Sequence, residues 1–282
     1  MNRLFLKKLL KDKVALLSII IIFTIIVAGI FAPIISPNNP YEVNLENKLL
    51  SFSLQYPLGT DHLGRCIASR LIYGIRTTVF YALFAMFITV LVGVFFAVIA
   101  IFSNSLKNII LRACDILLSF PSELMMLAIV GLIGTGIENI IIAAIVSKVA
   151  WYTRMIYTFC ITHMNTNFIY YSKVLNIPKT MILRKHLIPL ILSDVAMLAT
   201  LNVGTIILSI SALSFLGLGV QAPTCEWGIM LNEAKELMSI NPYMMLPAGI
   251  MILIVVASFN FLGDCIRDAL DPTYHLKVKD EV

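Results

Sequence analysis

Side chains able to bind or transform a ligand are few and scattered in this chain of 282 residues. No G-x-x-x-x-G-K-[S/T] phosphate loop occurs, and the glycine-rich GLIGTG at 131–136 lacks the lysine, so the chain is not expected to hydrolyse ATP itself. No nucleophile, base and orienting group are found together, so we expect neither an enzyme nor a bound cofactor. The histidines lie far apart and form no H-x-x-x-H pair, which predicts no metal site built by this chain alone. They are His62, His163, His186 and His275.

Two acidic residues in apolar surroundings, Glu123 and Asp194, are the best candidates for contact with a ligand. A charged side chain at membrane depth is costly to bury, and it is a functional hypothesis by default. Lys148 also lies in an apolar run, where its long side chain can snorkel towards water. Glu123 and Asp194 are therefore possible pathway residues, and neither is expected to ligate a metal ion.

The elements that must position these groups are membrane helices. Hydrophobic residues make up 59% of the chain and charged residues 13%, whereas soluble domains are about one-quarter charged. A helix crosses the hydrocarbon core with about 20 apolar residues. The alternation of a β-barrel is absent, so we expect an all-α integral membrane protein with six spans. These are 14–35, a retained anchor rather than a cleaved signal peptide, then 77–102, 113–134, 140–159, 188–212 and 244–263.

The distribution of Lys and Arg predicts which side of the membrane each segment faces. If the N-terminus is in the cytoplasm, fifteen of these residues lie on the cytoplasmic side and five on the outer side, which is the excess that cytoplasmic loops usually carry. Lys148 lies within a span and is not counted. Both termini are therefore predicted to be cytoplasmic in a multi-pass membrane protein, and the Ile-, Asn- and Lys-rich composition suggests a bacterial cell membrane. Because topology explains the net charge of +5, that charge gives no support to nucleic-acid binding.

A basic stretch at 167–189, NFIYYSKVLNIPKTMILRKHLIP, separates the fourth and fifth spans on the cytoplasmic side. Good N-cap residues precede a helix predicted from Phe168, with Tyr171 and Leu175 on the same face. Asn176 tolerates the left-handed conformation that ends a helix, and Pro178 suits the first turn of a second helix, to about residue 186. Such a short helix can dock into a groove of a soluble partner; the alternative is a solvated, positively charged loop.

This stretch resembles the cytoplasmic coupling motif of ATP-binding-cassette importer permeases, E-A-A-x-x-x-G followed by nine residues and I-x-L-P. Aligned on Pro189, the E-A-A positions fall on Tyr170, Tyr171 and Ser172, and the glycine on Asn176. Asn replaces Gly where a left-handed corner is needed, whereas the usual acid is missing at Tyr170.

Longer motifs resemble the dipeptide, oligopeptide and nickel permease subfamily and together span nearly the whole chain. YPLGTDHLGRCIASRLIYGIRTT at 56–78 departs from the subfamily signature at Cys66, where Asp is usual. The other motifs are DILLSFPS at 115–122, LSFLGLGVQAPTCEWGIML at 213–231 and NFLGDCIRDALDP at 260–272.

The resemblance implies an anchor helix and a five-helix core that pairs with a second, homologous permease. It also implies two cytoplasmic ATPase subunits, which bind ATP and Mg, and an extracellular or periplasmic solute-binding protein. The domain boundaries implied are a cytoplasmic N-terminus at 1–13, an anchor helix at 14–35, an external segment at 36–76, a core at 77–265 and a cytoplasmic tail at 266–282. Within the core, a coupling loop is expected at 160–188. An external segment at the mouth of the pathway, here called the lip, is expected at 215–243. The residues implied in coupling to the ATPase are Phe168, Tyr170, Tyr171, Ser172, Leu175, Asn176 and Pro178.

The external motifs are expected to be mainly structural. Asp61 and Arg65 are close enough to form an ion pair, with Gly59 and Gly64 bending the chain around them. The Gly- and Pro-containing segment before Trp227 suggests a rigid lip, where contact with a delivering binding protein is an alternative to a scaffold role. The candidate residues are Gly59, Asp61, Gly64, Arg65, Glu226, Trp227 and Gly228.

The transported substrate remains open at this point. The runs GTGIENIIIAAIVSKVAWYTRM at 134–155 and VQAPTCEWGIMLNEA at 220–234 look more like nickel permeases of the C type than peptide permeases. Nickel, free or chelated, is therefore favoured over a short peptide, although neither requires a His or Cys cluster. A different class, a secondary transporter or channel, would use Glu123, Lys148 and Asp194 as ion-coupling groups.

Overall fold

The computed structural model describes residues 8–270, apart from the side chains of Lys173 and Lys179. Within that range every regular element is helical, and one isolated bridge joins Thr60 to Cys66. The all-α prediction is confirmed. The expected cytoplasmic segments 1–13 and 266–282 lie mostly outside the described residues.

The helices follow one another with short connections, except between α3 and α4 and between α11 and α12. The first half of the chain contains α2 (Lys13–Ile30), α3 (Ala32–Ile35), η1 (Leu45–Asn47), α4 (Ile67–Ile75), η2 (Arg76–Phe80), α5 (Tyr81–Phe102), α6 (Asn104–Leu118) and α7 (Ser122–Ile133). The second half contains α8 (Ile137–Met164), α9 (Asn167–Val174), α10 (Lys179–Ile182), η3 (Leu183–Leu187), α11 (Ile188–Phe215), α12 (Trp227–Lys235), η4 (Pro242–Met245) and α13 (Leu246–Leu270).

Five helices of the described chain are long and apolar enough to cross a membrane: Lys13–Ile30, Ile67–Phe102, Ile137–Met164, Thr180–Phe215 and Pro242–Leu270. The prediction of one continuous helix over 113–134 is wrong. That region contains α6 and α7, which meet at an angle of 88° around Ser119–Pro121 and count as a sixth span only if the bent pair is one span. Proline disfavours the helical conformation of the residue before it, here Phe120, which explains the break.

Two other boundaries differ from the sequence prediction. The second membrane helix begins at Ile67 rather than Thr77, so the last ten residues of the expected external segment 36–76 are helical. The helix that contains the predicted fifth span, 188–212, begins at Thr180 rather than Ile188. The reason is that α10, the π-helical turn η3 and α11 form one helix of 36 residues.

Small residues allow the helices of the bundle to approach closely. The buried stripe of α5 is Ala82, Ala85, Thr89, Gly93 and Ala97, spaced three or four residues apart, and it packs on α8. A side chain at Gly93 would press against Tyr152 of α8. Such small-residue stripes are the usual means of helix packing in membranes, where the hydrophobic effect does not drive helices together.

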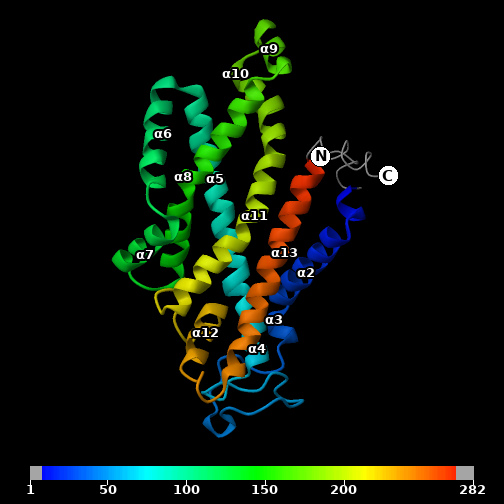
Figure 1. Cartoon of the computed structure of the whole chain (residues 1–282), viewed down its shortest axis with the longest axis vertical. Coiled ribbons are helices and arrows are strands. Elements are labelled where there is room, and N and C mark those ends of the chain that lie inside the picture. Colours follow the sequence, from blue (N-terminus) through cyan, green and yellow to red (C-terminus); the bar gives the residue numbers. More distant parts are fainter. Residues whose placement is uncertain (1–7, 271–282) are drawn as a thin grey trace.

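The bundle has two distinct ends (Figure 1). One end carries α9 and α10, together with the start of α2 and the end of α13, whereas α4 and α12 lie near the other. Helices α11 and α13 pack side by side, with α2 against α13, and α6 packs on α5 and α8.

Candidate functional site

The helix predicted in the basic stretch is α9, and it ends at a corner fixed by Asn176. The residue has φ +58°, so the predicted left-handed conformation is confirmed. The N–H of Ile177 donates to the carbonyl of Ser172 at 3.1 Å, which is the long hydrogen bond of a Schellman cap. Asparagine therefore takes the position that glycine most often occupies at helix ends.

Helix α9 presents an apolar face to its surroundings. Tyr171, Val174 and Leu175 are 71%, 81% and 74% exposed. On the opposite side Ile169 is fully buried, and Ser172 is buried with its hydroxyl donating to the carbonyl of Phe168 at 3.0 Å. Ser172, one of the expected coupling residues, thus lies on the side of α9 turned towards the protein.

The other expected coupling residues lie around this face. Phe168 is half-exposed, and its ring meets that of His186 edge-on, with 4.8 Å between the ring centres. Tyr170 is also half-exposed, and Pro178 is exposed immediately before α10. The His186 contact joins the start of α9 to the helix that continues into α11.

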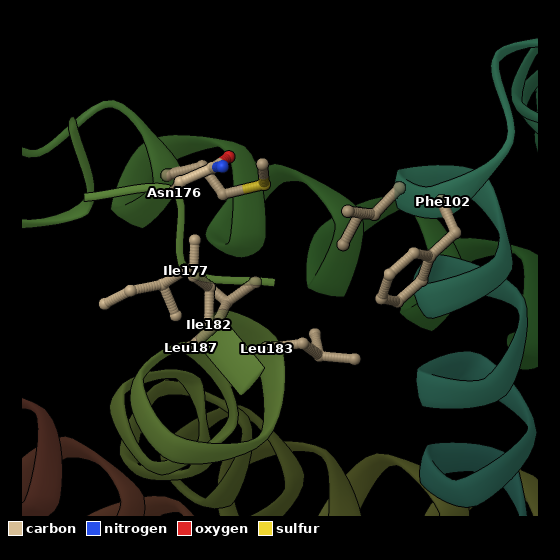
Figure 2. A pocket seen from close by; sticks show the side chains of 8 residues that line it. Phe102, Asn176, Ile177, Ile182, Leu183 and Leu187 are labelled. Atoms are coloured by element: carbon tan, nitrogen blue, oxygen red, sulfur yellow. The ribbon is translucent and has the colours of Figure 1, made fainter. Parts of the chain in front are cut away.

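An apolar cavity of about 260 Å³ lies beside the corner (Figure 2). Phe102, at the end of α5, faces it from one side, and Ile182, Leu183 and Leu187 line the other. Asn176 and Ile177 lie at its edge. The corner is therefore not packed tightly against α5, and no feature of the sequence indicated this cavity.

At the other end of the bundle, three buried charged residues, Asp61, Arg65 and Arg70, form a cluster with the partly buried Glu233. Asp61 Oδ2 lies 2.6 Å from Arg65 Nε and 2.6 Å from Arg70 Nη1. Glu233 Oε2 of α12 lies 2.9 Å from Arg65 Nη2 and 2.6 Å from Arg70 Nη1. The predicted Asp61–Arg65 pair is confirmed, whereas Arg70 and Glu233 were missed. Two cations and two anions compensate one another, as buried charges require.

The backbone around this cluster depends on glycine. Gly59 and Gly64 have φ +77° and +76°, and a Cβ on either would collide with the backbone carbonyl of Leu50 or Asn44. Their predicted role in bending the chain is confirmed.

Glu226, Trp227 and Gly228 of the predicted lip are packed tightly against the bundle. Trp227 is fully buried, and its indole N–H donates to the carbonyl of Leu71 at 3.0 Å. Glu226 is also buried and caps α12 by accepting the N–H of Ile229 at 2.9 Å. A Cβ on Gly228 would collide with the backbone of Ser211. These contacts hold Glu226, Trp227 and Gly228 in fixed positions within the bundle.

Burial and neighbouring charges shift the pKa values of the Asp61 and Glu226 carboxyl groups in opposite directions. Burial opposes ionisation of Asp61, but Arg70 and the N–H and guanidinium of Arg65 outweigh it, so the pKa of Asp61 lies below its ordinary value. Burial raises the pKa of Glu226, although the N–H of Gly228 and the hydroxyl of Ser211 partly offset the shift.

Asp61, His62 and Glu233 bring three possible metal-ligating atoms within 4.8 Å of one another. Sequence analysis did not predict this group, because Glu233 is far from the other two residues along the chain. Both carboxylates are already paired with Arg65 and Arg70, whose positive charges oppose a metal cation. We therefore assign these carboxylates to the ion-pair cluster.

The two possible pathway acids are not brought together. Glu123 Oε1 lies 3.8 Å from Lys148 Nζ, and Asp194 Oδ2 lies 2.8 Å from His163 Nε2. Lys148 and His163 are both on α8, fifteen residues apart, which corresponds to about 22 Å along the helix. Glu123 and Asp194 thus belong to separate pairs.

Comparison with known proteins identifies the kind of protein to which these features belong. Residues 89–275 match the family described as binding-protein-dependent transport system inner membrane component. The chain belongs to this family. Residues 1–56 match the N-terminal transmembrane domain of oligopeptide transport permease C. The chain is thus a permease subunit of an ABC importer and a multi-pass membrane protein.

Individual relatives differ in what they transport. The metal-staphylopine import system permease protein CntC of Staphylococcus aureus is 41% identical over 98% of this chain and 96% of its own. The dipeptide transport system permease protein DppC of Alkalihalophilus pseudofirmus is 36% identical over 94% and 88%. The nickel transport system permease protein NikC of Escherichia coli is 35% identical over 84% and 86%. All three belong to multi-subunit import systems.

Proposed function

We propose that this chain forms a translocation pathway with a second, homologous permease, and that α9 is its contact with a cytoplasmic ATPase. The observation that carries the proposal is the exposed apolar face of α9 at Tyr171, Val174 and Leu175. Exposed apolar helix faces of this kind are typical of helices that dock into a groove of a partner.

The connection of α9 to the membrane helices supports a role in transmitting movement. The Asn176 corner leads directly into the 36-residue helix Thr180–Phe215, and the Phe168–His186 contact braces it. Two ATPase subunits would bind ATP and Mg, and their closure would move α9 and bias the bundle between two states. The end carrying α9, and with it both termini, would face the cytoplasm, and a solute-binding protein would deliver the substrate at the end carrying α4 and α12.

For the substrate we propose a transition-metal ion, nickel among them, carried free or within an organic chelate. The 41% identity to a metal-staphylopine permease over nearly the whole chain supports this proposal. The nickel permease relative supports it too, and the dipeptide permease relative makes a short peptide the second candidate.

A pair of charge substitutions tests the coupling role of α9. Tyr171→Asp and Leu175→Asp place a carboxylate on the exposed face, where burial in a partner's groove would be unfavourable, whereas the free permease tolerates it because both sites are more than two-thirds exposed. We expect loss of ATPase co-purification and of uptake, with membrane insertion unchanged. Tyr171→Phe is the matched control and should retain both. ATPases that still co-purify with either Asp variant would refute the assignment.

Uptake measurements test the transport class and the substrate. Cells with and without this gene are supplied with radioactive nickel, nickel chelated by histidine, or a labelled dipeptide. We expect gene-dependent uptake of nickel in one of its forms, abolished when the phosphate loops of the partner ATPases are inactivated. Uptake that persists with inactive ATPases would indicate a secondary transporter or channel instead.

A further inference from the structure

A second cavity, of about 310 Å³, lies at the bend between α6 and α7. Residues from the end of α6 and the start of α7 line one side of it, and α8 and α11 supply the other, with Lys148, Trp151 and Asn202 among them. Lys148 and Asn202 lie in the middle parts of their long helices. The cavity is thus placed within the membrane-spanning part of the bundle.

Lys148 is the one charged side chain among the described residues that line this cavity. Its side chain is 11% exposed, whereas its partner Glu123 is 64% exposed. Their separation of 3.8 Å exceeds hydrogen-bond distance, and within residues 8–270 no hydrogen bond to the Lys148 ammonium is found. An ammonium group at this depth is costly unless an acceptor satisfies it.

The start of α7 adds to the positive potential at the cavity. Pro121 and Ser122 line the cavity, and no side chain caps this twelve-residue helix. Its first N–H groups therefore present the positive end of the helix. The amide of Asn202 is already engaged, since it donates to the carbonyl of Leu198 at 2.8 Å. Glu123 lies in the first turn of α7 and is the acid paired with Lys148, but its side chain is 64% exposed, so the cavity side of the ammonium group carries no charged partner among the lining residues.

We propose that this cavity is a transit site for a carboxylate group of the imported solute, with Lys148 as its binding residue. The inference rests on the proposed function, because it assumes that a solute passes between the permeases. A carboxylate would replace the long contact to Glu123 with a charged hydrogen bond to the ammonium group. The carboxylate of an organic metal chelator and that of a dipeptide share this chemistry, whereas a bare divalent cation would be repelled.

The test uses the complete importer, with its second permease, ATPases and binding protein, in liposomes supplied with ATP. Nickel chloride, nickel–histidine and dialanine are offered separately. We expect Lys148→Met to lower uptake of the carboxylate-bearing probe by about tenfold or more, with ATPase and permease co-purification retained. Lys148→Arg should recover most of that loss. Glu123→Gln should raise uptake, by up to about fivefold, because Lys148 loses a competing carboxylate.

Five results would overturn the inference. Equal losses in Lys148→Met and Glu123→Gln would make the pair structural, and unchanged uptake in Lys148→Met would remove Lys148 from the pathway. Loss of the second permease from purified Lys148→Met would show that a permease side chain is the ammonium's partner. Uptake of nickel chloride alone would exclude a carboxylate. Wild-type liposomes that import no probe would overturn the proposed function as well, which distinguishes that failure from the others.

Discussion

Replacing Glu233 with Gln should destabilise the end of the bundle that carries α4 and α12 far more than the loss of a surface charge would. Glu233 Oε2 accepts from Arg65 at 2.9 Å and from Arg70 at 2.6 Å, and both guanidinium groups are almost fully buried. The variant keeps the side-chain size but leaves two buried cations with Asp61 as their one carboxylate partner in the cluster. We expect a loss of about 3 kcal/mol in the free energy of unfolding.

A double-mutant cycle separates this interaction from general damage. Unfolding of the purified permease in detergent is followed for Glu233→Gln, Arg70→Met and the double variant. We expect a coupling energy of about 2 kcal/mol, because the double variant leaves fewer unpaired charges. Glu236→Gln, at an exposed position just after the same helix, is the matched control and should change stability by less than about 0.5 kcal/mol. Additive single effects would refute the ion-pair cluster as a source of stability.

Three further predictions concern single positions. Asn176→Gly should preserve ATPase co-purification, whereas Asn176→Val should reduce it, since a β-branched residue pays about 1–2 kcal/mol for φ +58°. The raised pKa of Glu226 means that its contribution to stability is present below about pH 4.3 and lost as pH rises through the higher folded-state value. Melting of the Glu226→Gln variant should therefore depend less on pH. Asp61 has a lowered pKa, so its contribution is present above about pH 3.9 and lost as pH falls through the lower folded-state value, and melting of Asp61→Asn should show no such acid transition.

Local chemistry made parts of this structure predictable. The corner at Asn176 follows from the one non-glycine residue type that tolerates a left-handed turn well, followed closely by a proline. Gly59 and Gly64 likewise signalled tight bends, and the spans followed from runs of apolar residues. In each case a few neighbouring residues determine the outcome.

The missed features depend on contacts between distant segments. Hydropathy reports how apolar a segment is but not its direction, so 113–134 was predicted as one helix although Pro121 divides it. Arg70 and Glu233 are 163 residues apart, and their pairing exists only once α4 and α12 are packed. Lys148 was interpreted as a snorkelling side chain because the sequence does not show the cavity formed by α6, α7, α8 and α11.

The continuous helix Thr180–Phe215 has a mechanical consequence. Thirty-six residues at 1.5 Å each make a rod about 54 Å long, with the α9 corner at one end and the lip segment at the other. A tilt of about 10° about one end displaces the opposite end by about 9 Å, roughly the width of a helix. The π-helical turn η3 begins seven residues after Asn176, so any flexing there would leave α11, the greater part of the rod, to move as one piece. In the helix Thr180–Phe215, a short arm at the end of α10 therefore lies on the corner side of η3, and α11 forms the long arm on the other side.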